Sequence, residues 1–60
     1  MIPTNATHYL VNFGRYVEYY QVINGDVYLM SEEELHYLHW TKSDVILITQ
    51  EMRDKGEVDL

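Results

Sequence analysis

The 60-residue sequence has no cysteine, a single proline and only four lysine and arginine side chains. Without cysteine there can be no disulfide bridge and no thiolate metal cluster, which stabilise many very small proteins. Cysteine-free composition is compatible with a reducing cytoplasm. The shortage of cations disfavours direct binding to nucleic acid or to an anionic membrane, because both require positive charge on the protein.

Long hydrophobic runs are also missing. The longest aliphatic run, Val45 to Ile48, is far too short to span a bilayer. The start Met1-Ile2-Pro3 has no basic region followed by an apolar one, so we expect no signal peptide. These features predict a cytoplasmic protein with no membrane contact.

The length predicts one small α+β domain over residues 1–60. A domain of this size buries only about 60% of the surface that its unfolded chain exposes, so its stability margin is thin. With no covalent staples available, association is the remaining route to stability. We therefore expect a homodimer, and we expect residues 1–6 and 56–60 to be flexible.

The negative charge is concentrated in one part of the chain. Between Tyr16 and Glu51 there are seven acidic residues and one base, Lys42, within a total net charge of −6. The same stretch contains five of the six tyrosines and the only tryptophan, Trp40. Interleaved acidic and aromatic side chains favour a surface that binds a basic partner. The alternative is that the charge only keeps a small domain soluble.

Asn24-Gly25 is the strongest local signal. A type I′ turn needs positive φ at both central residues, and this dipeptide supplies it between two strand-like runs. The expected hairpin has three cross-strand pairs: Ile23 with Asp26, Val22 with Val27 and Tyr20 with Leu29.

Gly14-Arg15 predicts a second two-residue turn, of type II′. Its expected pairs are Phe13 with Tyr16, Val11 with Glu18 and Tyr9 with Tyr20. The two registers place a mostly apolar set on one face of a β-meander: Tyr9, Val11, Phe13, Tyr16, Glu18, Tyr20, Val22, Val27 and Leu29. The opposite face is mixed and includes Ile23, Tyr28 and Met30. An unpaired Glu18 on the apolar face would be unfavourable, so we expect it at an open end of the sheet or against a partner, unless this register is wrong.

Ser31-Glu32-Glu33-Glu34 has the pattern of a capping box and predicts a short helix that begins at Glu32 and ends near Trp40 to Lys42. Asp44 to Thr49 is β-branched and apolar on both faces, which predicts a final strand. A helix that begins at Ser43 is the alternative. The complete expectation is a meander, one short α-helix and then a final strand.

Candidates for catalysis and metal binding are weak. Glu32, His36 and His39 would lie one turn apart on the expected helix, but a zinc site needs three or four ligands, and His8 is the only other histidine. No glycine-rich phosphate loop, cysteine nucleophile or serine with a base partner is present. We expect neither an enzyme, nor a cofactor, nor a metal.

Carboxylates at regular positions can imitate the phosphates of DNA and offer a DNA-binding protein a decoy for its own cationic groove. On Ser31, Glu32, Glu34, Leu35, Tyr37 and the acidic-led strand from Asp44, the chain resembles the small uracil-DNA glycosylase inhibitors encoded by bacteriophages. The resemblance covers about Tyr28 to Met52. It implies a dimeric DNA mimic in the host-cell cytoplasm, with Glu34 and Tyr37 as contact residues.

The sequence departs from that family in two ways. Glu33 stands where the family has a helix phenylalanine that helps to enclose a leucine of the target, and about two extra residues separate Tyr37 from the last strand. Trp40 is the candidate to replace the missing apolar surface. The expected partner-binding residues are Glu18, Glu32, Glu33, Glu34, Tyr37, Trp40 and Asp44.

Two rival functions remain open. One is a non-catalytic interaction module, antitoxin-like or a phage adaptor, with a mainly apolar interface. The other is a small enzyme subunit or metal-binding domain that uses His36 and His39. A decoy's association should slow steeply with ionic strength, whereas that of an apolar adaptor should not.

Overall fold

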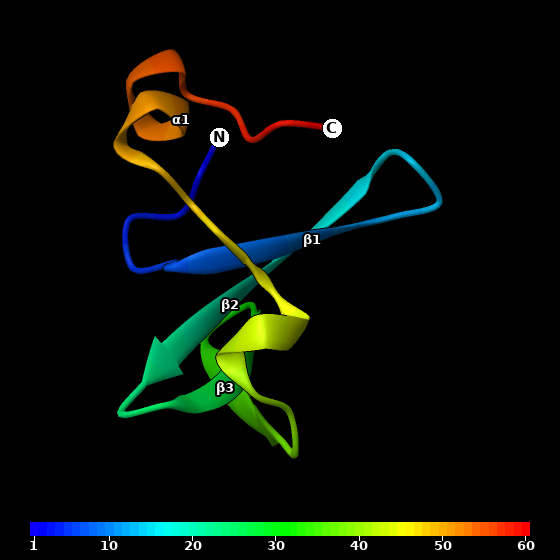
Figure 1. The fold of residues 1–60 in the computed structure, drawn as a ribbon, viewed down its shortest axis with the longest axis vertical. Helices are drawn as coiled ribbons and strands as arrows, with labels where there is room; N and C mark the ends of the chain where they lie inside the picture. The colour runs from blue at the N-terminus through cyan, green and yellow to red at the C-terminus, as the bar shows by residue number, and fades with distance from the viewer.

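The computed structural model describes residues 1–60 and contains one antiparallel sheet and one short α-helix (Figure 1). The elements in chain order are β1 (His8–Asn12), β2 (Tyr16–Ile23), β3 (Asp26–Ser31), β4 (Glu34–Leu38), the 3-10 turn η1 (Lys42–Asp44), β5 (Ile46–Leu47) and α1 (Gln50–Lys55). The five strands are ordered β4-β3-β2-β1-β5, so the chain forms a meander whose last strand returns to pair with the first. The expected α+β class is confirmed.

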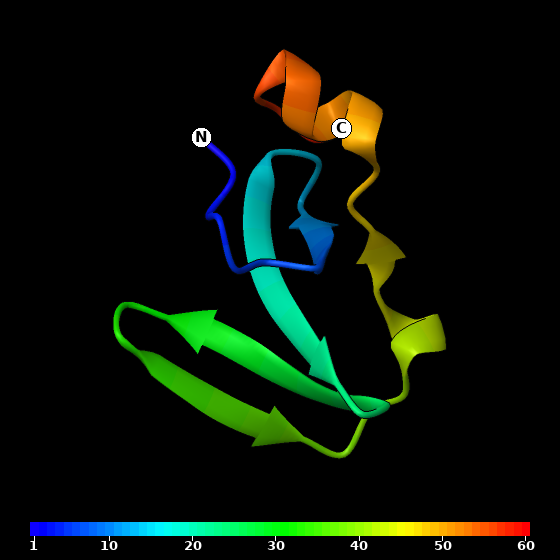
Figure 2. The same ribbon diagram turned by 90° about the vertical axis from the view of Figure 1, so that its left-hand side faces the viewer.

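The sheet is strongly bent. Figure 2 shows the β3–β4 hairpin crossing away from β1, while α1 lies at the opposite end of the molecule. The long strand β2 joins the two parts because it pairs with β1 on one side and β3 on the other. We call β1, β5, α1 and the chain ends the helix half. We call the β3–β4 hairpin, with the adjoining end of β2, the hairpin half.

The hairpin at Asn24-Gly25 forms as expected. Tyr20 pairs with Leu29, Val22 with Val27 and Ile23 with Asp26. Both turn residues have positive φ, +51° at Asn24 and +85° at Gly25, as a type I′ turn requires. Local chemistry is sufficient here because the turn itself sets the register of its flanking strands.

The register expected for β1 and β2 is wrong by one residue. Asn12 pairs with Tyr16, and Tyr9 faces Tyr19 instead of Tyr20. The loop has three residues, and Phe13 as well as Gly14 adopts positive φ, +56° and +72°. A one-residue slip moves every side chain of a strand to the other face, so Tyr9 and Tyr20 lie on opposite faces of the sheet.

With the observed pairing of β1 and β2, the sheet has a buried core on each of its two faces. On the helix face, α1 and the chain ends cover a cluster of five buried residues: Ala6, Tyr9, Ile48, Met52 and Val58. On the opposite face, which we call the loop face, the segment that follows β4 covers a second cluster: Tyr20, Val27 and Val45. Sequence reasoning assumed a single apolar face. Ala6 and Val58, in the end segments expected to be flexible, are buried members of the helix-face core.

The helix expected from Glu32 is wrong. Ser31 pairs with Glu34 across a tight turn in which Glu32 has φ +52°, and the chain continues as β4. A barely three-turn helix with a narrow apolar stripe is marginal in water. Strand β3 instead offers a complete backbone ladder with the cross-strand pairs Met30–Leu35 and Tyr28–Tyr37. Tertiary pairing therefore overrides the capping signal.

The last segment matches neither the expected strand nor the alternative helix from Ser43 in full. The strand expected from Asp44 to Thr49 is reduced to Ile46–Leu47, and the only α-helix begins after it, at Gln50. The Thr49 side chain caps this helix by accepting a hydrogen bond from Met52 N at 3.2 Å. Gly56 ends it in the left-handed conformation at φ +81°. The order is thus strand and then helix, the reverse of the expectation, and no helix is long and apolar enough to cross a membrane.

Candidate functional site

The acidic turn, Glu32 to Glu34, lies at the tip of the β3–β4 hairpin. All three side chains are exposed. From Tyr16 to Thr41 the chain has five carboxylates and no lysine or arginine. The turn has one close polar side-chain contact: Glu34 Oε2 lies 3.4 Å from His36 Nε2, and both side chains are about half or more exposed. The turn is therefore a concentrated negative charge that faces solvent.

Lys42 forms no ion pair with this turn. Burial first, and then the charge of Lys42, lower the pKa of the His8 imidazole in β1. The Thr7 hydroxyl is 2.7 Å from His8 Nδ1.

An aromatic row lies beside the acidic turn, on the part of the helix face that α1 does not cover. The rings of Tyr28 and Tyr37 are 5.6 Å apart, and those of Tyr37 and His39 are 4.9 Å apart. Leu35, Tyr37 and Ile23 remain 46%, 51% and 43% exposed. We call Ile23, Tyr28, Leu35, Tyr37 and His39 the aromatic surface.

A hollow connects the acidic turn to the covered part of the sheet. Its volume is about 360 Å³, and its lining includes Asn5, Gln21, Met30 and Leu35 in addition to the acidic turn. It continues the aromatic surface toward the N-terminal segment. A partner that contacts the aromatic surface would therefore meet carboxylates at its edge.

Glu18 has internal partners. It accepts a hydrogen bond from Asn12 Nδ2 at 2.6 Å and from the Tyr20 hydroxyl at 3.2 Å. Burial of Tyr20, together with the charge of Glu18 and this hydrogen bond, raises the pKa of Tyr20 to about 12. The expected contact of Glu18 with Val11 does not exist, because Leu10 is its partner in the observed register.

Trp40 and Asp44 also have structural roles. The Trp40 ring lies 5.6 Å from that of Tyr20 and covers part of the loop face, although it remains 39% exposed. Asp44 Oδ2 accepts a hydrogen bond from Thr41 N at 2.8 Å and thereby closes the turn before β5. Glu18 and Trp40 thus meet at Tyr20, away from the aromatic surface on the other face.

Glu34 and Tyr37 lie on opposite faces of β4. On a helix they would be one turn apart on the same side, but in a strand a three-residue spacing reverses the face. Tyr37 belongs to the aromatic surface, whereas Glu34 and His36 face the other way. The same alternation separates His36 from His39, and no group of three histidine or acidic residues could hold a metal ion.

The expected partner-binding residues did not include Ile23, Tyr28, Leu35 or His39. A signal was present for two of them, since the Asn24-Gly25 register already placed Ile23 and Tyr28 together on the mixed face. Leu35 and His39 could not be placed while the segment was read as helix.

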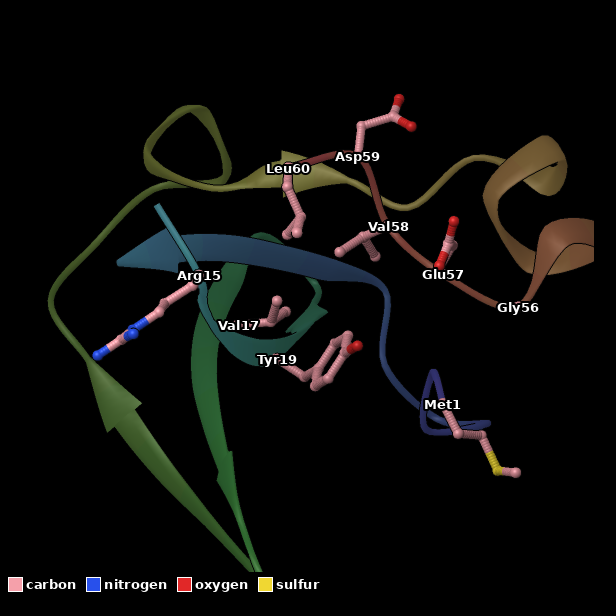
Figure 3. A pocket seen from close by; sticks show the side chains of 9 residues that line it. All are labelled: Met1, Arg15, Val17, Tyr19, Gly56, Glu57, Val58, Asp59 and Leu60. Atoms are coloured by element: carbon pink, nitrogen blue, oxygen red, sulfur yellow. The ribbon is translucent and has the colours of Figure 1, made fainter. Parts of the chain in front are cut away.

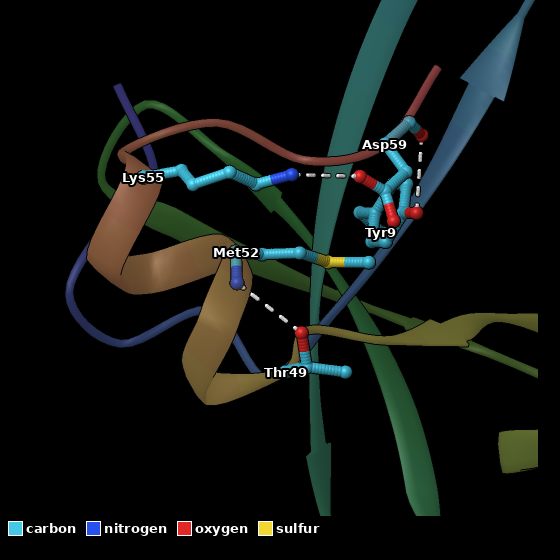
Figure 4. A network of polar contacts seen from close by, with 5 residues as sticks. All are labelled: Tyr9, Thr49, Met52, Lys55 and Asp59. Carbon is cyan, nitrogen blue, oxygen red and sulfur yellow. Dashed lines mark hydrogen bonds and ion pairs between the residues drawn. The ribbon is translucent and has the colours of Figure 1, made fainter.

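The helix half contains a second hollow, of about 450 Å³, between β2 and the C-terminal residues (Figure 3). Arg15, Val17 and Tyr19 form one wall, and residues 56–60 form the other. Polar contacts hold this end of the chain in place: the Tyr9 hydroxyl donates to the Asp59 carbonyl at 3.1 Å, and Lys55 pairs with the Asp59 carboxylate at 3.3 Å (Figure 4). Arg53 also donates to the Ala6 carbonyl. The two basic side chains of α1, Arg53 and Lys55, are therefore both bound to groups within the helix half.

Comparison with protein-family models found no match. Comparisons with curated proteins and with solved structures found none either.

Proposed function

We propose that this chain is a non-enzymatic, acidic protein that inhibits a nucleic-acid enzyme by occupying its DNA-binding groove, with uracil-DNA glycosylase as the first target to test. The observation that carries the proposal is the hairpin half, where four carboxylates have no lysine or arginine among them and three of the four form an exposed turn beside an aromatic surface. A cationic groove built to hold phosphates complements such a surface.

The corrected fold changes which residues support this proposal. The resemblance to the phage inhibitors was drawn on a capped helix, and that segment is a β-hairpin. Glu18, Trp40 and Asp44 have structural partners within the chain. The acidic turn and Tyr37 are the expected contacts with the most exposed side chains, although Glu34 also lies 3.4 Å from His36 and Tyr37 packs on Tyr28.

The test is uracil release from a labelled oligonucleotide in the presence of increasing amounts of the protein. Inhibition should be stoichiometric and competitive with DNA, and the protein alone should not shift a DNA probe in a gel. Its association with the enzyme should slow steeply as salt is added. Full enzyme activity at a large molar excess would reject the glycosylase as the target.

A matched pair of charge variants separates a local contact from overall charge. Glu32→Gln, Glu33→Gln and Glu34→Gln together remove three charges from the acidic turn. Glu51→Gln, Asp54→Asn and Glu57→Gln remove the same number from exposed positions in and after α1. The first variant should lose inhibition and the second should keep it. Equal losses would show that only net charge matters.

A second candidate is a non-catalytic interaction module, antitoxin-like or a phage adaptor, that binds mainly through apolar contacts. The exposure of Leu35, Tyr37, Ile46 and Leu47 favours it. Association that is insensitive to salt and is lost with the aromatic surface rather than with the acidic turn would select this function.

A further inference from the structure

Strand β4 is an edge without the usual protection. It ends the sheet and pairs only with β3, so the backbone N–H and C=O groups along its outer side have no strand partner. Natural edge strands are commonly protected by charged side chains, above all lysine, by proline, by a bulge or by very short length. β4 contains neither lysine nor proline, its one acidic residue is Glu34 at the turn, and it is five residues long, whereas the opposite edge, β5, has two residues. β4 is therefore the edge that can accept another strand.

The side chains along this edge differ between its two faces. Leu35 and Tyr37 are exposed on the helix face, where they adjoin Tyr28. Glu34 and His36 lie on the loop face. The acidic turn stands at the N-terminal end of the strand. A strand added here would place alternate side chains against an apolar row and against carboxylates.

Charge decides which kind of strand fits. The hairpin half has no lysine or arginine from Tyr16 to Thr41, so it lacks countercharges of its own. A second copy of this chain would bring a further net charge of −6 to the same edge. A basic strand, in contrast, complements the turn.

We propose that β4 accepts an extended, arginine- or lysine-bearing strand of the partner protein, which lengthens the sheet beyond its present edge. Apolar residues of that strand pack on Leu35 and Tyr37, and its cations face Glu34 and the rest of the acidic turn. Main-chain hydrogen bonds supply affinity, and the alternation of side chains supplies selectivity. This inference rests on the proposed function and names the element through which the partner is held.

The experiment uses the full chain and a short peptide in which arginine and valine alternate. Two isomers carry backbone N-methyl groups on the arginines only or on the valines only, so each blocks hydrogen bonding along one side of the peptide and keeps every charge. Binding is followed by amide chemical shifts of the labelled protein. We expect shifts centred on Glu34 to Leu38, loss of binding with one isomer, and retention with the other.

A matched pair of protein variants completes the test. Leu35→Asn removes apolar surface from β4 and should weaken peptide binding about tenfold, which corresponds to about 1.4 kcal/mol. Phe13→Asn removes an exposed apolar side chain from the β1–β2 loop, where φ is +56° and asparagine is readily accommodated. It should leave binding unchanged.

Three results would overturn the inference. Equal binding by both methylated isomers would show attraction by charge alone. Shifts centred on β5 or α1 would place the contact elsewhere. No binding of any peptide, by a chain that still inhibits its enzyme, would show that β4 is not the contact. In each case the uracil-release assay is read independently, so the proposed function is rejected only if inhibition itself is absent.

Discussion

The helix half and the hairpin half are built in different ways. Five buried residues form the core of the helix half, and Arg53 and Lys55 bind within it. The hairpin half has a smaller core, in which Tyr20 and Val27 pack with Val45, in addition to its backbone ladders. It leaves Leu35 and Tyr37 about half exposed and carries its carboxylates without lysine or arginine. The contrast indicates that the helix half has the larger core, and that the hairpin half leaves its carboxylates free to bind a basic partner.

The largest expected effect is a loss of folding stability when a side chain is removed from the core of the helix half. Tyr9 is 2% exposed, and its removal in Tyr9→Ala should lower the free energy of unfolding by about 3–5 kcal/mol, as for other large aromatic truncations. Tyr37→Ala removes a side chain that is 51% exposed and should lower it by about 1 kcal/mol or less. Urea unfolding of both variants measures the difference. Equal losses would contradict the division between the two halves.

The next prediction concerns binding by the hairpin half. Glu34→Ala and Tyr37→Ala should each weaken inhibition of uracil-DNA glycosylase, by about 1–3 kcal/mol. Because these residues lie on opposite faces of β4, losses in both would show that the partner encloses the edge of the sheet. Glu57→Ala, in the helix half, is the control and should not alter inhibition. A loss with Glu34→Ala alone would confine the contact to the loop face.

A measurement of the oligomeric state tests whether the helix half forms an interface between two copies of the chain. Ile46 and Leu47 of β5 are 48% and 59% exposed, which leaves the β5 edge of the sheet apolar. We expect light scattering at micromolar concentration to report about twice the chain mass of 7.2 kDa. Leu47→Lys should shift the population toward monomer and make it less stable. A clean monomer with a high melting temperature that does not depend on concentration would reject the homodimer.

The smallest expected effect is a pH dependence at the junction of the halves. The pKa of Tyr20 is raised to about 12, so the folded state holds this proton more tightly than the unfolded state, whose tyrosine pKa is about 10. The resulting stability is fully present below pH 10 and is lost as the pH rises toward 12. Tyrosinate absorbance should show one of the six tyrosines titrating late. Tyr20→Phe should remove that late step, and Glu18→Gln should move it to lower pH.

The parts of the fold that depend on residues close together in the sequence were predictable. The α+β class followed from length and pattern, and the Asn24-Gly25 register followed from turn geometry. The acidic turn and Tyr37 were identified as candidates for binding from charge and residue type. Their arrangement was not predictable, because the capping pattern at Ser31 indicated a helix where β3 offered a longer set of backbone bonds.

The amino-acid sequence by itself determined the excess of carboxylates in the middle of the chain, the absence of covalent staples and the hairpin at Asn24-Gly25. Only the tertiary structure decided the face on which each side chain lies. Burying Tyr9 beneath α1 and Tyr20 beneath Val45 requires cores on both sides of the sheet, and that requirement sets the register of β1. Side-chain direction in a strand alternates with every residue, so a one-residue difference in pairing, which local patterns scarcely distinguish, changes which surface is buried.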